Sequence, residues 1–185
     1  MKKSANLTWD SNSGALSRTE ADFPRWYALQ TRYKYEKKVS AQLSRLGWET
    51  FLPLLNGTHQ WSDRRKKIAT PLFPGYTFVQ LNAQSLIQKK FLRTDGVLGL
   101  ISFAGNAVPV PREQVESLRR ILSINVPFSL HPFLKAGQRV RIRGGCLDKL
   151  EGRLLQADGK KLVISIACIQ QAIAISIEGY DLQLL

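Results

Sequence analysis

Apolar positions follow two different periods in residues 25–124. Four short segments have the aromatic and β-branched content of strands: 26–31, 48–54, 75–81 and 97–103. Between them, apolar residues recur three or four positions apart, which is the period of an amphipathic helix. These helical segments are 34–46, 83–92 and the stretch that follows Pro111. The pattern predicts a mixed α and β region in this part of the chain.

The first helical segment has the clearest stripe. Its apolar residues are spaced by four, four and three, and they are Tyr35, Val39, Leu43 and Leu46. Gly47 follows at once and is expected to end the helix, because glycine adopts the left-handed conformation of a C-cap without steric cost. This stripe is therefore expected to pack against the sheet.

After residue 132 the helical period disappears. Arg139–Arg143 alternates polar and apolar residues, and Gly144-Gly145 is expected to turn the chain. Four further short strands are expected at 150–155, 161–166, 172–177 and 180–184. Five short strands in about fifty residues are typical of a small barrel. The sequence thus predicts a flexible leader at 1–24, a first domain at 25–124, a linker with two prolines at 125–132 and a second domain at 133–185.

The charge distribution adds information about partners. The chain carries a formal net charge of +13. Residues 25–128 hold 16 Lys and Arg against 6 Asp and Glu, whereas residues 129–185 hold 8 against 5. Most of the excess belongs to the first domain. Such an excess indicates a polyanionic neighbour, most often nucleic acid.

Sequence motifs for catalysis, cofactors and membranes are missing. His59 and His131 are the two histidines, neither lies in a catalytic or metal-ligand pattern, and no phosphate-binding or nucleophile motif occurs. Cys146 and Cys168 lack metal-ligand spacing and favour free, buried thiols over a disulfide. No apolar run approaches the length of a membrane span. We therefore expect a cytoplasmic protein that is not an enzyme and has no catalytic residues, no metal and no cofactor.

Two groups of residues are candidates for nucleic-acid binding. On the first helix, one polar face carries Lys34, Lys38, Gln42 and Arg45, and Arg32 precedes it. Such a row can hold a phosphate backbone, with Gln42 able to bond a base edge. The second group lies at the centre of an exposed hairpin predicted at 57–71, and it consists of Arg64, Arg65, Lys66 and Lys67. The alternative for both groups is an ordinary solvated surface.

Two motifs together resemble the NusG family of transcription factors. The first is the pair WYALQT at 26–31 and PLFPGYTFV at 71–79, which resembles the family's N-terminal domain. The second is VRIRGGCLDKLEGRLL at 140–155, which resembles the KOW motif, where a glycine at the place of Gly152 allows close backbone approach. The resemblance covers residues 25–185 in the order that the family has.

The resemblance implies an α+β protein. Its N-terminal part is an α/β sandwich with an antiparallel sheet flanked by helices, and a small five-stranded SH3-like β-barrel follows. The family's N-terminal domain docks on the β′ clamp helices of RNA polymerase, and its aromatic positions correspond here to Phe73, Tyr76 and Phe78. The alternative is that some of these aromatics fill the core, because alternate strand residues lie on opposite faces.

The resemblance also implies a function. The segment IQQAIAI at 169–175 is more similar to operon-specific antitermination paralogues than to the housekeeping form. We therefore expect a monomeric factor that binds the β′ clamp helices, with the β subunit as a further contact, and non-template or upstream DNA. It would suppress pausing or termination, and its barrel would bind a small-subunit ribosomal protein or Rho. The alternatives are a general factor that recruits Rho and a ribosome-associated, RNA-binding KOW protein.

Overall fold

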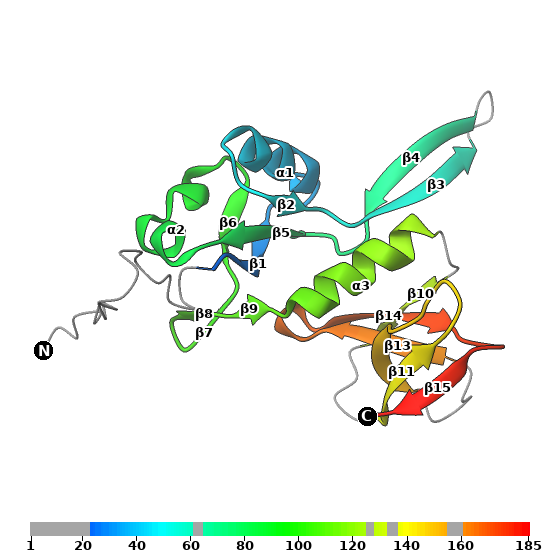
Figure 1. Cartoon of the computed structure of the whole chain (residues 1–185). Helices are drawn as coiled ribbons and strands as arrows, with labels where there is room; N and C mark the ends of the chain where they lie inside the picture. The colour runs from blue at the N-terminus through cyan, green and yellow to red at the C-terminus, as the bar shows by residue number, and fades with distance from the viewer. Residues whose placement is uncertain (1–22, 61–64, 125–127, 133–136, 155–160) are drawn as a thin grey trace, which may run out of the picture.

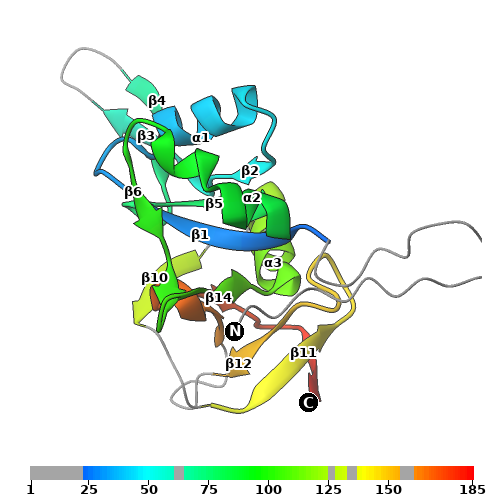
Figure 2. The same cartoon turned by 90° about the vertical axis from the view of Figure 1, so that its left-hand side faces the viewer.

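The structure is a computed structural model that describes residues 23–60, 65–124, 128–132, 137–154 and 161–185. Its elements form successive layers, which Figure 1 and Figure 2 show from two sides. Two helices lie above a first antiparallel sheet, a third helix lies below it, and a second antiparallel sheet lies beneath that helix. The expected α+β fold class is confirmed.

The first sheet is built on its central strand, β1 (Arg25–Thr31). Its strand order is β2-β5-β1-β6, and β9 also pairs with β1. The other strands are β2 (Thr50–Phe51), β5 (Tyr76–Leu81), β6 (Val97–Leu100) and β9 (Pro109–Val110). All of these pairings are antiparallel, with Arg25 opposite Leu81 and Gln30 opposite Tyr76. The sequence thus located both long strands, β1 and β5, within one residue.

Each face of this sheet has its own apolar cluster. On one face, Leu29 and Val79 pack with Val39 and Leu43 of helix α1 (Glu36–Arg45). Helix α2 (Ala83–Gln88) and the 3₁₀ turn η2 (Lys90–Arg93) follow along the same layer. The opposite face packs against helix α3 (Arg112–Ser123), through residues that alternate with the first set. This alternation is what a strand buried on both faces requires.

The buried stripe of α1 is shorter than the sequence predicts. Val39 and Leu43 are fully buried and Tyr35 is partly buried, but Leu46 is 63% exposed. Leu46 is the C-cap of the helix, and Gly47 follows with φ +89°. The chain therefore turns away from the helical period one residue before the fourth apolar position, and the prediction for Leu46 is wrong.

A long hairpin projects from the first sheet. Strands β3 (Leu54–Gln60) and β4 (Arg65–Pro71) pair along seven positions, from Leu54 opposite Pro71 to Gln60 opposite Arg65. Both views show it extending away from the rest of the molecule. The expected hairpin is confirmed. A much shorter hairpin joins β7 (Ser102–Phe103) and β8 (Asn106–Ala107).

The second sheet has six strands rather than the five expected. Their order is β10-β14-β13-β12-β11-β15, with every pairing antiparallel. The strands are β10 (Phe128–Pro132), β11 (Arg139–Arg143), β12 (Glu151–Leu154), β13 (Lys161–Ile166), β14 (Gln171–Ser176) and β15 (Asp181–Leu184). The additional strand is β10, which lies in the segment predicted as linker. That prediction is wrong for 128–132, because this segment pairs with β14.

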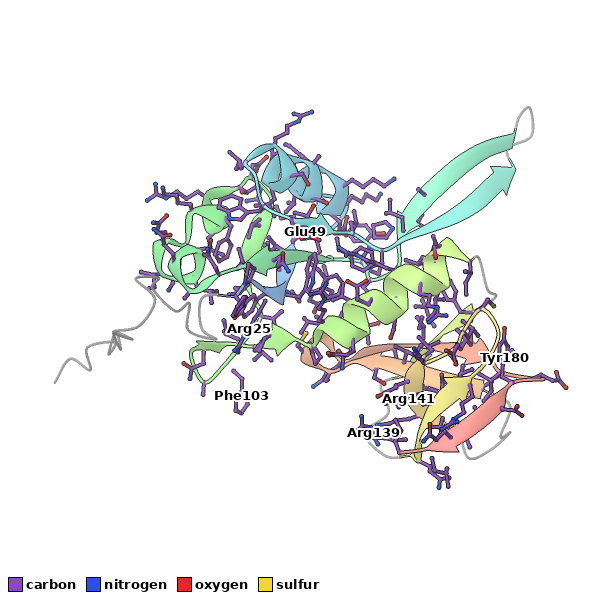
Figure 3. The ribbon with its side chains drawn as sticks, viewed as in Figure 1. Arg25, Glu49, Phe103, Arg139, Arg141 and Tyr180 are labelled. Carbon is purple, nitrogen blue, oxygen red and sulfur yellow. The ribbon has the colours of Figure 1, made fainter. Side chains whose placement is uncertain are left out.

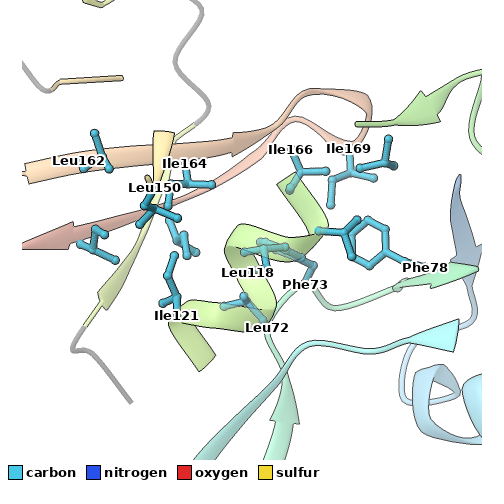
Figure 4. Packing of buried hydrophobic residues seen from close by; sticks show 14 of the residues in the cluster. Leu72, Phe73, Phe78, Leu118, Ile121, Leu150, Leu162, Ile164, Ile166 and Ile169 are labelled. Atoms are coloured by element: carbon cyan, nitrogen blue, oxygen red, sulfur yellow. The ribbon is translucent and has the colours of Figure 1, made fainter. Parts of the chain in front are cut away.

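The second sheet shares its core with α3 and the first sheet. Val115, Leu118 and Ile121 of α3 lie in one cluster with Phe73 and Phe78 and with the apolar residues of β11, β13 and β14. Figure 4 shows Leu118 and Ile121 between these two groups. The sequence instead predicts a separate core for the C-terminal part. Helix α3 accounts for the difference, because its apolar surface is in contact with both sheets.

Candidate functional site

The outer face of α1 is exposed and basic. Of the predicted residues, Arg32, Lys34, Lys38 and Arg45 are exposed and Gln42 is half-buried. Some of these cationic side chains already have partners within the protein. The Nζ of Lys38 lies 2.7 Å from the Asp95 carboxylate, which raises the pKa of Lys38 and lowers that of Asp95. The Lys34 ammonium lies 5.5 Å from the ring centre of its neighbour Tyr33.

A hollow lies at the C-terminal end of this row. It has a volume of about 380 Å³ and is formed by α1 and the turn after η2. Its lining residues are Gln42, Arg45, Leu46, Lys90, Arg93, Thr94 and Asp95. Within the described part of the chain, the Gln42 Oε1 and Thr94 Oγ1 atoms are buried and have no hydrogen-bond partner. The hollow therefore combines three cations, Arg45, Lys90 and Arg93, with one carboxylate, that of Asp95.

The structure thus adds two residues to the predicted set. Lys90 and Arg93 line the same hollow as Gln42 and Arg45, although some fifty residues separate the two pairs. Gly96 brings the two segments together, since a Cβ there would lie 2.6 Å from the Tyr35 ring at the start of α1. The sequence signal for these residues is the basic run at 89–93, which the periodicity of α1 alone does not reveal.

The basic residues of the hairpin lie apart from α1. Arg65, Lys66 and Lys67 form the start of β4, on the part of the hairpin farthest from the first sheet. Arg64 lies outside the described residues, as do the side chains of the other three. The two predicted basic groups are therefore separate regions of the molecule.

The three predicted aromatic anchors are not equally accessible. Phe73 and Phe78 are 1% and 0% exposed, and their rings meet edge to face with centres 6.4 Å apart. Phe78 also stacks on Phe51 at 6.0 Å. Tyr76 is half-buried at the edge of the same cluster. Phe73 and Phe78 thus fill the core, as the alternative interpretation holds, and Tyr76 is the one of the three predicted anchors that solvent reaches.

A buried carboxylate fixes the bend before these aromatics. Glu36, at the start of α1, is 2% exposed, and its Oε1 accepts a hydrogen bond from the Gly75 N–H at 2.7 Å. The carbonyl of Gly75 accepts from the Thr31 N–H at 2.8 Å. Gly75 adopts φ +82°, a conformation that favours glycine. The Pro74-Gly75 bend is therefore held to both α1 and β1. Sequence analysis missed the role of Glu36.

Two neighbouring arginines of α3 contact different sheets. The Arg119 guanidinium stacks over Trp26 and Phe51 at 4.9 and 5.1 Å and bonds Glu49 at 3.1 Å. Figure 3 labels Glu49 beside the first sheet. Arg120 instead donates to the backbone carbonyls of Cys146 and Asp148, in the loop after β11. Arg119 thus holds α3 to the first sheet, and Arg120 holds it to the second.

A pocket that is open to solvent lies beside the junction of α3 with the second sheet. It has a volume of about 630 Å³ and lies between one side of α3 and strands β11 to β13. Its rim carries Glu113 from α3 and, from the sheet, Glu151, which pairs with Arg139 at 3.5 Å and also with Arg141. Figure 3 labels both arginines on the second sheet. Polar and charged side chains from both α3 and the sheet therefore line this pocket.

The two cysteines are free thiols, but they differ in environment. Cys168 is half-buried, and burial raises its pKa to about 11. Cys146 is exposed, with its Sγ 3.1 Å from the Tyr180 hydroxyl. The predicted burial of Cys146 is wrong, because the loop after β11 lies at the surface.

This difference predicts selective alkylation. At pH 8, about one Cys168 side chain in a thousand is a thiolate, and the thiolate is the nucleophile. We expect iodoacetamide to label Cys146 at least tenfold faster than Cys168 in the folded protein, as measured by peptide mass spectrometry. In urea the two rates should converge. Equal rates in the folded protein would contradict the described environment of Cys168.

Among the residues that the structure describes, no three His, Cys, Asp or Glu side chains are grouped as metal ligands. None of the helices in these ranges is long and apolar enough to cross a membrane. The surfaces that remain as functional candidates are the basic hollow on one side of the first sheet and the apolar contact with α3 and the second sheet on the other.

Comparison with known proteins identifies the family. A family model described as "Transcription termination factor nusG" matches residues 24–119, slightly more than half of the chain. The "Transcription termination/antitermination protein NusG" of Borreliella burgdorferi is 25% identical over 167 residues, which are 77% of this chain and 87% of that protein. The protein of the same name from Staphylococcus epidermidis is 24% identical over 173 residues, with 86% and 94% covered.

One solved structure with a similar chain is titled "Domain interaction in Thermotoga maritima NusG". It is 20% identical and has a TM-score of 0.46, and the match covers 89% of this chain and 94% of that one. The family match itself rests on the N-terminal sheet and its helices, including β1 and β5, where the sequence motifs lie. Proteins of this family are transcription factors without enzymatic activity. The chain belongs to the NusG family.

Proposed function

We propose that this chain is an antitermination factor that binds RNA polymerase at the β′ clamp helices and suppresses pausing or termination. The observation that carries the proposal is the two-sided character of the first sheet. One side carries the basic hollow of Gln42, Arg45, Lys90 and Arg93, and the other carries the apolar contact around Phe73 and Tyr76. One side suits a phosphate backbone and the other a partner helix, so a single domain can bridge DNA and polymerase.

In this conformation the apolar side is occupied. Phe73, α3 and the second sheet lie in one cluster, so when that sheet moves away it exposes the apolar face of α3, which adjoins Phe73 and would extend the proposed polymerase-binding surface. The apparent affinity of such a surface equals its intrinsic affinity multiplied by the fraction of molecules that are open, so it is low when few molecules are open. The effect on transcription then follows from preferential binding to the processive state of the polymerase over the paused one, and it requires no covalent chemistry.

The second sheet is proposed to recruit a further partner. A small-subunit ribosomal protein and Rho are the two candidates, and they correspond to different roles. The names of the relatives from Borreliella and Staphylococcus include both termination and antitermination, so a general factor that recruits Rho is the second candidate function. Division of the chain into two functional domains, at 25–124 and from about 128 onward, belongs to the same proposal.

In vitro transcription separates these roles. With purified core polymerase on a template that contains a pause site and a Rho-dependent terminator, we expect the full chain to shorten the pause and to increase read-through. A general, Rho-recruiting factor would instead increase termination when Rho is added. Unchanged pausing and termination, with and without Rho, would contradict both roles.

The basic hollow is proposed as the DNA contact. We expect Arg45→Gln with Arg93→Gln to lower the salt dependence of binding to upstream-fork DNA, because each lost phosphate contact reduces the slope by about one unit. The measurement is fluorescence anisotropy at several salt concentrations. Arg112→Gln is the matched control, since Arg112 is exposed at the start of α3 on the other side of the sheet. An unchanged slope in the double variant would mean an ordinary solvated surface.

A further inference from the structure

Strand β10 is a weakly held edge of the second sheet. Of the strands in the described part of the chain, it pairs with β14 alone, with Phe128 opposite Ile175 and Leu130 opposite Ile173. Its partners Ile173 and Ile175 are fully buried, but Leu130 is 59% exposed and Phe128 only partly buried. The strand is therefore held mainly by backbone hydrogen bonds. Short edge strands with few buried apolar contacts have low local stability.

The position of β10 limits how far the second sheet can move. Helix α3 ends with Ile124 as its C-cap, and β10 begins four positions later at Phe128. Four residues span at most about 14 Å when fully extended. As long as β10 stays paired, its first residue, Phe128, keeps the paired end of β14 close to the end of α3, because Phe128 itself must remain within that distance. Two helices side by side are about 20 Å across, so a helical hairpin needs more clearance than this tether gives.

Release of β10 removes this limit. The free segment would then run from Ile124 to Arg139, the first residue of β11. These fifteen positions reach about 50 Å when extended, and about 22 Å on average for a flexible chain. The length of the connection between the two sheets therefore depends on whether one short strand is paired.

We propose that β10 is a releasable tether, paired with β14 in the closed molecule and detached when the second sheet leaves α3. The inference rests on the proposed function in one respect only, which is that RNA polymerase is the partner that binds the surface exposed by this separation. Detachment of β10 and separation of the second sheet from α3 are then one cooperative event.

Arg120 provides a way to test the coupling at a distance. Its two hydrogen bonds end on the loop between β11 and β12, and β13 and β14 separate those strands from β10 in the sheet. Arg120→Ala should therefore weaken the contact of α3 with the sheet without touching β10 or its partner strand. Arg143→Ala is the matched control, since Arg143 is exposed and donates to Gln183 within the sheet.

The experiment is amide hydrogen exchange of the full chain alone, followed by NMR. We expect Arg120→Ala to accelerate exchange of the β10 amides, and of the β14 amides that face them, by roughly tenfold, because hydrogen bonds from a charged donor are lost. Arg143→Ala should leave these rates unchanged. If Arg120→Ala leaves the β10 rates at their original values, the proposed coupling is wrong, whether or not the protein binds polymerase.

A reversible lock gives a second test. Ser129 lies opposite Ala174, so Ser129→Cys with Ala174→Cys would tie β10 to β14, in a background with Cys146→Ser and Cys168→Ala. In the Arg120→Ala protein, we expect the oxidised form to scatter X-rays as the closed structure does and the reduced form to have a larger radius of gyration. Equal expansion of both forms would overturn the proposal.

Discussion

Phe78→Ala lowers the free energy of unfolding by about 3–5 kcal/mol, the usual cost of truncating a fully buried phenylalanine. Phe78 is 0% exposed and lies between Phe51 and Phe73, with ring centres 6.0 and 6.4 Å away. Removing its ring leaves a cavity at the centre of the cluster that joins the first sheet to α3. Urea denaturation followed by circular dichroism measures the change.

Phe103→Ala is the matched control for this prediction. Phe103 lies on β7 with 78% of its surface exposed, so its truncation should change stability by less than about 0.5 kcal/mol. A loss of polymerase binding by Phe78→Ala with unchanged stability would instead indicate that Phe78 reaches the partner directly. That outcome would contradict the burial of this side chain.

Gly152→Ala destabilises the second sheet by about 1–3 kcal/mol, the range for added groups in a well-packed interior. A Cβ at Gly152 would lie 2.8 Å from both the Leu162 Cγ and the backbone oxygen of Val163. The backbone oxygen cannot move without breaking the pairing of β12 with β13. The expected role of this glycine, a close backbone approach, agrees with this geometry.

Gly99→Ala provides the comparison for Gly152→Ala. Gly99 also lies in a strand, β6, but no heavy atom lies within 4 Å of the position that a Cβ would occupy there. We expect its replacement to change the unfolding midpoint little. A destabilisation of the same size at both positions would show that strand glycines matter here for backbone freedom rather than for the contact with Leu162 and Val163.

The sequence located the elements whose pattern is local. Strand β1 and strand β5 follow from their aromatic and β-branched residues, and α1 follows from the spacing of Val39 and Leu43. Strand β10 could not be predicted in the same way. Its segment has a proline at its end and no clear alternation, and it becomes a strand because β14 offers a free edge at the right distance from α3.

The functional surfaces were predictable only in part. The row on α1 was visible because Lys38, Gln42 and Arg45 follow a helical spacing. Lys90 and Arg93 join them only through the tertiary contact of Gly96 with Tyr35. The alternation of residues on β5 indicated that its aromatic side chains could not all face one side of the sheet. The structure shows that both faces of β5 are covered. This covering could not be predicted from the sequence of β5, because it involves α3 and the second sheet.

The covered apolar surface gives the proposed function a regulatory consequence. Besides the shared apolar cluster, Arg120 and β10 hold the second sheet near α3 from two further places. In the proposed function, opening would expose the apolar face of α3 beside the surface around Tyr76, while the basic hollow on the other side stays exposed throughout. DNA could accordingly be bound in either state, whereas polymerase binding would depend on opening.

The most direct measurement is an equilibrium titration of the fluorescently labelled full chain with purified core RNA polymerase. The proposed function predicts saturable binding that an isolated fragment of the β′ clamp helices competes away. It also predicts tighter binding by Arg120→Ala, because a larger fraction of molecules is open. Absence of binding by both proteins, or binding that the clamp-helix fragment leaves unchanged, would contradict the proposal that this chain acts on polymerase through the covered surface.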